Sequence, residues 1–150
     1  MARKDATTRN AQAEVQRSRA HLEAIDLLTD TRGMVQVLDD LFTRNRDTLH
    51  LEGSAIGGLA RFFNIIDANV LGVQRIIDQL PVNIEATDLT NDVRGMVLFL
   101  EATLTASRNT LLLEANSIDG LSRFMQVIDD SLLAIIRVID PEDGTHAAAA

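Results

Sequence analysis

The sequence predicts an all-α fold, in which a duplicated helical hairpin forms a pseudo-two-fold four-helix bundle with an additional N-terminal helix. Residues 26–78 align without a gap to residues 88–140, an offset of 62, and 25 of the 53 aligned pairs are identical. Apolar side chains, almost all aliphatic, recur at spacings of three and four in both copies. A lone hairpin leaves its apolar stripe exposed, so we expect the two copies to cover each other within a single domain.

The first element is a helix over residues 6–27, whose apolar stripe is thin. Residues 1–21 hold five basic and two acidic side chains, a charge of +3, and the whole chain carries −8, so the remainder carries −11. An acidic body repels nucleic acid and anionic lipid, which makes nucleic acid an unfavourable partner. We expect the basic segment to contact an acidic body, of its own molecule or of another.

In the first hairpin repeat, 26–78, the first helix follows a candidate N-cap at Thr29 or Asp30, and the second helix is capped by Ser54. The second repeat, 88–140, follows the same pattern, with Asn116 as the counterpart of Ser54. Residues 81–91 are expected to join the copies, and residues 141–150, which include Pro141 and His146, to form a mobile tail.

Antiparallel packing within each hairpin brings the start of its first helix beside the end of its second. We therefore predict two ion pairs, Asp30–Arg75 and Asp92–Arg137, at equivalent places in the repeats. Glycine recurs inside the first helix of each repeat, at Gly33 and Gly95, where it costs about 1 kcal/mol against alanine. Close crossing of the helices is the preferred explanation.

The stretch "TLHLEGSAIGGLARFF", residues 48–63, is interpreted as the turn between the helices of the first hairpin. It also resembles the His-x-x-Lys-Gly-Ser/Ala-Ser/Ala motif of histidine phosphotransfer domains, which are four-helix bundles. Alignment of Gly53 and Ser54 on the small residues of that motif puts Glu52 in place of lysine and leaves His50 one residue out of register. A phosphotransfer-like signalling domain centred on His50, Glu52, Gly53 and Ser54 is therefore the alternative function. The second copy has Leu112 in place of His50, which favours the structural interpretation.

The segment Leu51-Glu52-Gly53-Ser54 and about 24 residues after it resemble short uncharacterised bacterial helical-hairpin proteins, which carry this segment before a final apolar helix. The resemblance implies a bacterial source and a helical hairpin, and it implies no activity. The second copy departs from it, with Ala115 and Asn116 at the last two positions.

Motifs that carry chemistry are sparse in this sequence. It has no cysteine, so thiolate nucleophiles and Cys-ligated zinc are excluded, and it has no Glu-x-x-His pair of the kind that binds two irons. The pairs Asp26/Asp30 and Asp88/Asp92 each lie on one helical face and have the oxygen ligands that Mg²⁺ or Ca²⁺ prefers. We prefer to interpret them as acids near a helix start, where the helix dipole favours negative charge. No catalytic, cofactor-binding or metal-binding residue is predicted, and no cofactor.

These observations predict a non-enzymatic protein–protein interaction module of a bacterial cell, acting as an adaptor, regulator or structural component. Its partner would be another protein or a second copy, giving a homodimer. The sequence shows no Sec signal and no uninterrupted apolar run of 18 residues, so we expect a cytoplasmic protein with no membrane partner. A small-molecule sensor with a cavity between the hairpins is a further alternative.

Overall fold

The computed structural model of the chain describes residues 2–80, 84–107 and 109–140, with side chains described from residue 12 onward within these ranges. The expected tail 141–150, with Pro141 and His146, lies outside the described residues.

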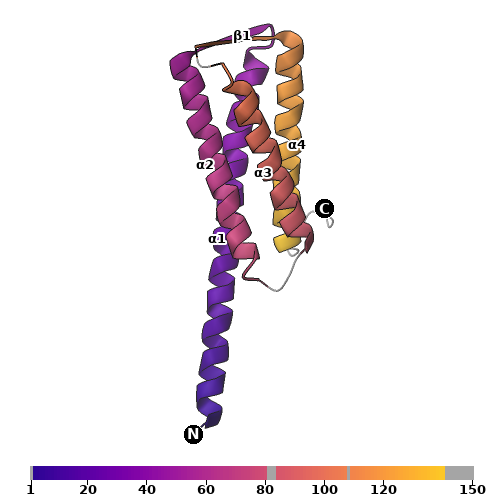
Figure 1. Cartoon of the computed structure of the whole chain (residues 1–150). Helices are drawn as coiled ribbons and strands as arrows, with labels where there is room; N and C mark the ends of the chain where they lie inside the picture. Colours follow the sequence, from indigo (N-terminus) through magenta and orange to yellow (C-terminus); the bar gives the residue numbers. More distant parts are fainter. Residues whose placement is uncertain (1, 81–83, 108, 141–150) are drawn as a thin grey trace, which may run out of the picture.

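Helices dominate the described chain, as predicted, and a small two-stranded sheet accompanies them (Figure 1). The elements in order are α1 (Ala2–Arg44), β1 (Thr48–Glu52), α2 (Gly53–Ile77), α3 (Ile84–Leu104), β2 (Thr110–Glu114) and α4 (Ala115–Ile139). Helix α1 packs against α2 and α4, and α3 packs against the same two helices. The strands cross one end of this assembly, and α1 extends far beyond the other helices at the opposite end.

Buried positions in all four helices alternate between spacings of three and four residues. This spacing is typical of helices that lie almost parallel and interlock their side chains along their length. In α1 the buried positions are Ala24, Leu28, Thr31, Val35, Leu38 and Phe42, and in α3 they are Ala86, Thr90, Val93, Val97, Leu100 and Leu104. The facing positions are Ile56, Leu59, Phe63, Ile66, Val70, Val73 and Ile77 in α2, and Ile118, Met125, Ile128, Leu132 and Ile135 in α4.

Helix α2 is also long and apolar enough to cross a membrane by length and composition, which the search for uninterrupted apolar runs missed. A third of its most apolar window is buried inside the protein, and its core positions face the other helices. A core helix of a helical assembly shows the same pattern, because its apolar face is covered by its neighbours.

Two threonines occupy core positions of α1 and α3. Thr31 and Thr90 are fully buried, and each hydroxyl donates a 2.6 Å hydrogen bond to the carbonyl four residues earlier, on Leu27 and Ala86 respectively. Because the hydroxyls are satisfied within their own helices, their burial leaves no unpaired polar atom in the core.

The expected boundary between a separate N-terminal helix, 6–27, and the first hairpin helix is wrong. Helix α1 continues without a break through Thr29 and Asp30, the candidate N-caps, and ends at Arg44. This part of the sequence has no proline, and its single glycine, Gly33, costs too little to break a helix of this length. The linker expected over 81–91 is also too long, since α3 begins at Ile84.

The interpretation of residues 48–63 as the turn of a helical hairpin is wrong as well, because Thr48–Glu52 form β1 and α2 begins at Gly53. Strand β1 pairs with β2 in antiparallel register, and the helices that follow begin at Gly53 and Ala115. The N-cap residues are the exposed Glu52 and Glu114, and neither side chain makes a capping hydrogen bond. Ser54 therefore lies inside the first turn of α2, where the predicted capping role does not apply.

Candidate functional site

A groove between α3 and α4 is open to solvent and has a volume of about 560 Å³. It is lined by Asn91, Asp92, Gly95, Met96 and Phe99 of α3 and by Phe124, Val127 and Ser131 of α4. The floor is open at Gly95, where an added Cβ would meet no atom within 4 Å, and the same holds for Gly33. Close helix crossing is therefore the wrong explanation for these two glycines.

Large apolar side chains stand at the rim of this groove instead of in the core. Phe99 is 60% exposed and Val127 is 52% exposed. The ring of Phe99 lies tilted at 36° to that of Phe124, with centroids 6.1 Å apart, so the two rings form an aromatic contact across the groove. Adjacent exposed apolar groups of this kind mark interaction surfaces in soluble proteins. We call these two side chains and the floor at Gly95 the α3–α4 patch.

Opposite charges flank the two ends of the α3–α4 patch. Asp92 is exposed and lies seven residues before Phe99, about 10 Å away along the axis of α3. Arg123 is exposed on α4 beside Phe124, toward the strands, and it lines the neighbouring groove between α1 and α4 at the edge of the patch. The patch therefore has a negative end, an apolar centre and a positive end.

The predicted ion pairs Asp30–Arg75 and Asp92–Arg137 are wrong, since neither pair is joined by an ion pair or a hydrogen bond in the described chain. The reason is the register of the hairpin. An added Cβ on Gly72 of α2 would lie 3.3 Å from Leu27 of α1, which places these residues at one level. Asp30 lies three residues after Leu27, and Arg75 lies three residues after Gly72. Because the two helices run in opposite directions, these two side chains lie on opposite sides of the shared level, about 9 Å apart along the helix axes.

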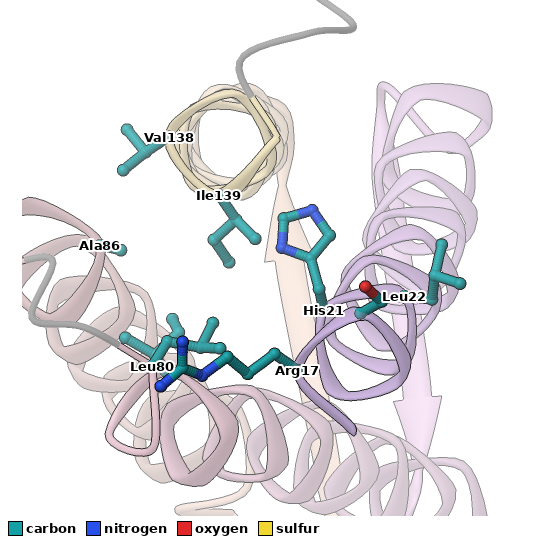
Figure 2. A pocket seen from close by; sticks show the side chains of 9 residues that line it. Arg17, His21, Leu22, Leu80, Ala86, Val138 and Ile139 are labelled. Atoms are coloured by element: carbon teal, nitrogen blue, oxygen red, sulfur yellow. The ribbon is translucent and has the colours of Figure 1, made fainter. Parts of the chain in front are cut away.

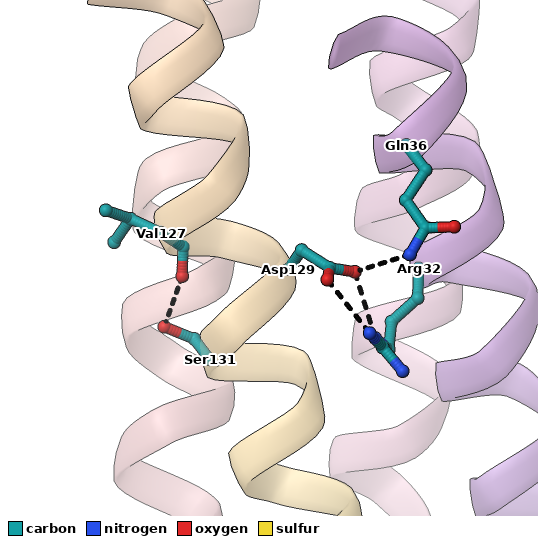
Figure 3. A network of polar contacts seen from close by, with 5 residues as sticks. All are labelled: Arg32, Gln36, Val127, Asp129 and Ser131. Carbon is teal, nitrogen blue, oxygen red and sulfur yellow. Dashed lines mark hydrogen bonds and ion pairs between the residues drawn. The ribbon is translucent and has the colours of Figure 1, made fainter. Parts of the chain in front are cut away.

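The arginines that do form interhelical ion pairs reach into the other half of the chain. The guanidinium of Arg32 donates from two nitrogens to the two carboxylate oxygens of Asp129, at 2.9 Å each, and Gln36 donates to the same carboxylate at 3.4 Å (Figure 3). Arg94 donates in the same way to Asp67, at 2.8 and 3.4 Å. The hydrogen bond to each carboxylate raises the pKa of Arg32 and of Arg94 above the ordinary arginine value.

The residues of the phosphotransfer alternative lie close together, although on different elements. His50 is exposed in the middle of β1, opposite Leu112, and Gly53 and Ser54 form the first turn of α2. Alternate residues of a strand share a face, so the carboxylate of Glu52 lies on the same exposed side as His50 and disfavours an incoming phosphoryl group. The alternative stays a prediction, tested by an acid-labile phosphate that is lost in His50→Gln.

The aspartate pairs of the metal hypothesis lie on α1 and α3. Within the described residues no group of three or more His, Asp or Glu side chains is arranged to hold a metal ion. Asp26 and Asp30 lie in the middle of α1, so the explanation that they sit near a helix start is wrong for this pair.

Comparison with protein-family profiles, curated proteins and solved structures gives no match for this chain.

Proposed function

We propose that the chain is a non-enzymatic protein–protein interaction module, an adaptor, regulator or structural component of the bacterial cytoplasm. Its framework would be a duplicated helix–strand–helix unit whose two copies form a pseudo-two-fold four-helix bundle. Its partner is a second copy of the chain, bound through the α3–α4 patch. The exposed ring of Phe99, in contact with Phe124 and beside the open floor at Gly95, is the observation that carries this proposal.

The strand register supports the pseudo-two-fold framework. Thr48 pairs with Glu114, and Glu52 pairs with Thr110. Adding the repeat offset of 62 residues to Thr48 and Glu52 gives Thr110 and Glu114, so the two pairs are equivalent. His50 lies opposite its own counterpart, Leu112. In a two-fold arrangement, residue i of one unit contacts residue j of the other, and j of the first contacts i of the second. The strands follow this rule, with the axis at the His50–Leu112 pair.

The two interhelical ion pairs support the same axis. Arg32 and Arg94 are 62 residues apart, as are Asp67 and Asp129, and each arginine binds the aspartate of the other repeat. Both pairs are also the most shielded from solvent, since the exposed fractions of these four side chains lie between 21% and 28%. The pattern is the one expected when a dimer of identical units has been fused into one chain.

The α3–α4 patch has the shape of a surface that binds a copy of itself. It offers a protruding side chain, Phe99, and an open floor, Gly95, on one face and about one helical turn apart. Two patches related by a two-fold axis can each place the protruding ring over the floor of the other. The equivalent surface of the first repeat has Val37 and Ile65 in place of Phe99 and Val127, so it lacks the aromatic anchor that dominates stable interfaces.

The charges favour the same antiparallel arrangement. When two patches meet with opposite polarity, Asp92 of each copy lies at the end that carries Arg123 of the other. The attraction between these ends offsets part of the repulsion between two bodies that each carry −8.

Sedimentation velocity over a concentration series tests the proposal. We expect the wild-type chain to shift from monomer to dimer as the concentration rises, and Phe99→Glu to remain monomeric, because a buried unpaired carboxylate is strongly unfavourable. The matched control is Val37→Glu, the equivalent position of the first repeat, which is also 60% exposed and should leave the dimer intact. A wild-type chain that stays monomeric up to about 1 mM would contradict the proposal.

A charge swap tests the polarity of the interface. Asp92→Arg alone should weaken the dimer, because it places two positive charges together, and Asp92→Arg combined with Arg123→Asp should restore it. If the double variant is as weak as the single one, these residues do not face each other and the antiparallel arrangement is wrong.

A further inference from the structure

A second concave site lies at the end of the molecule opposite the strands, where α1 extends past the other helices. This cavity has a volume of about 600 Å³, within the range of small-molecule sites in proteins. Its walls are apolar and come from all four helices or their immediate ends, through Leu22, Ile77, Leu80, Ala86, Val138 and Ile139. The cavity is therefore suited to an apolar group, and it is separate from the α3–α4 patch.

The polar side chains of the cavity come from α1 and are the neutral Ser18 and the basic Arg17 and His21. Arg17 and His21 are four residues apart and lie on one face of the helix, and Arg17 extends across the cavity toward Leu80 (Figure 2). Within the described chain Arg17 has no ion pair, whereas the imidazole of His21 lies 4.0 Å from the carboxylate of Asp140. A guanidinium remains charged at every physiological pH and binds a carboxylate through two parallel hydrogen bonds.

We propose that this cavity binds a free aliphatic monocarboxylate, a fatty acid of medium or long chain. The alkyl chain would lie among Ile77, Val138 and Ile139, and the carboxylate would bind the guanidinium of Arg17. Arg17, which has no ion pair among the described residues, matches one negative charge, and the neighbouring Asp140 and the acidic body disfavour a dianionic phosphate or an anionic membrane surface.

Calorimetric titration with dodecanoate below its micellar concentration tests the inference. We expect 1:1 binding, with an affinity that falls about four-fold for each methylene removed from the chain. Dodecyltrimethylammonium, with the same chain and the opposite charge, should bind at least about ten-fold more weakly, because it loses the ionic hydrogen bonds and meets Arg17 as a like charge.

Two variants separate this site from unspecific binding of detergent-like molecules. Arg17→Gln should weaken dodecanoate at least about ten-fold, and the fold is preserved because this side chain is exposed. Arg19→Gln is the matched control, since it removes the same charge from a neighbouring exposed position that does not line the cavity.

Three results would each overturn the inference. They are no binding of dodecanoate, equal affinity for the anionic and cationic amphiphiles, and equal weakening by Arg17→Gln and Arg19→Gln. Co-sedimentation with neutral phosphatidylcholine vesicles, if it persists in Arg17→Gln, would identify the cavity as a membrane contact and overturn it as well. None of these measurements depends on Phe99, so they remain informative if the proposed dimer fails.

Discussion

At the scale of single residues, two ion pairs link helices of the two halves of the chain. Arg32 and Arg94 each make two hydrogen bonds to a carboxylate on the other half of the chain. These arginines recur at equivalent positions of the two repeats, a pattern that favours pairing across helices. The partners were out of reach of a sequence argument, since Asp67 and Asp129 become neighbours only through the packing of one repeat on the other.

Double-mutant cycles should give similar coupling energies for the two ion pairs, about 0.5–1 kcal/mol each. One cycle combines Arg32→Gln with Asp129→Asn, and the other combines Arg94→Gln with Asp67→Asn. The reason is that each pair joins an arginine and an aspartate by two hydrogen bonds and that the side chains are similarly shielded, between 21% and 28% exposed. Free energies of unfolding in urea at neutral pH provide the measurement. The control pair Arg44 and Asp40, with side chains 80% and 69% exposed, should couple by less than about 0.3 kcal/mol.

The pH dependence of this contribution follows from the raised arginine pKa values. The pKa of each arginine is higher in the folded protein than in the unfolded chain. The ion pair therefore contributes its full stability at every pH below the pKa of the unfolded chain. This stability is lost only as the pH rises through the pKa of the folded protein. The arginine side of both pairs should therefore contribute equally at pH 7 and pH 9. A coupling energy that falls between these values would show that another group titrates with the pair.

Gly95→Ala should stabilise the protein by about 0.5–1 kcal/mol, and Gly33→Ala by a similar amount, in thermal or urea unfolding. Both glycines have ordinary helical backbone and open space where the methyl group would go. Gly72→Ala is the control, because its Cβ would lie 3.3 Å from the Leu27 side chain, which must then shift, so the gain should be smaller. Equal gains at all three positions would mean that this contact relaxes freely.

At the scale of elements, the helices were predictable and the strands were missed. Spacings of three and four residues locate α2 and α4 within a few residues, because their apolar faces are wide. The pentapeptide "TLHLE" alternates polar and apolar residues, and this signal of a strand was overlooked because Leu49 also fits the helical spacing of α1. A strand this short is stable only when paired with a remote segment, which local pattern alone does not reveal.

The inward leucines of the strands should carry most of the stability of this element. Leu49→Ala and Leu113→Ala should each lower the free energy of unfolding by about 2–3 kcal/mol, since both side chains are buried in the common core. His50→Ala, between the inward positions of β1 and exposed to solvent, should change it by less than about 0.5 kcal/mol. A large effect at His50 would contradict the assignment of inward and outward faces.

At the scale of the whole molecule, the two halves of the described chain share one apolar core. The buried cluster includes side chains from both halves without a gap, from Leu28 and Phe63 in the first to Val97 and Leu132 in the second. The duplication in the sequence led us to expect this mutual cover. The exposed α3–α4 patch was not foreseen, because Phe99 differs from its counterpart Val37 and only the packed helices show that both positions face solvent.

Separation of the chain into residues 1–80 and 84–150 should give two fragments that fold only together. Each fragment alone would expose the apolar face of two helices, so it should have reduced helical circular dichroism and no cooperative thermal transition. Mixed in equal amounts, the fragments should recover the helical signal of the intact chain and sediment as a 1:1 complex. Leu132→Asp in the second fragment is the control, because a charge at this fully buried position should abolish the recovery. If either fragment unfolds cooperatively on its own, the repeats are independent units, and mutual burial is not what holds the molecule together.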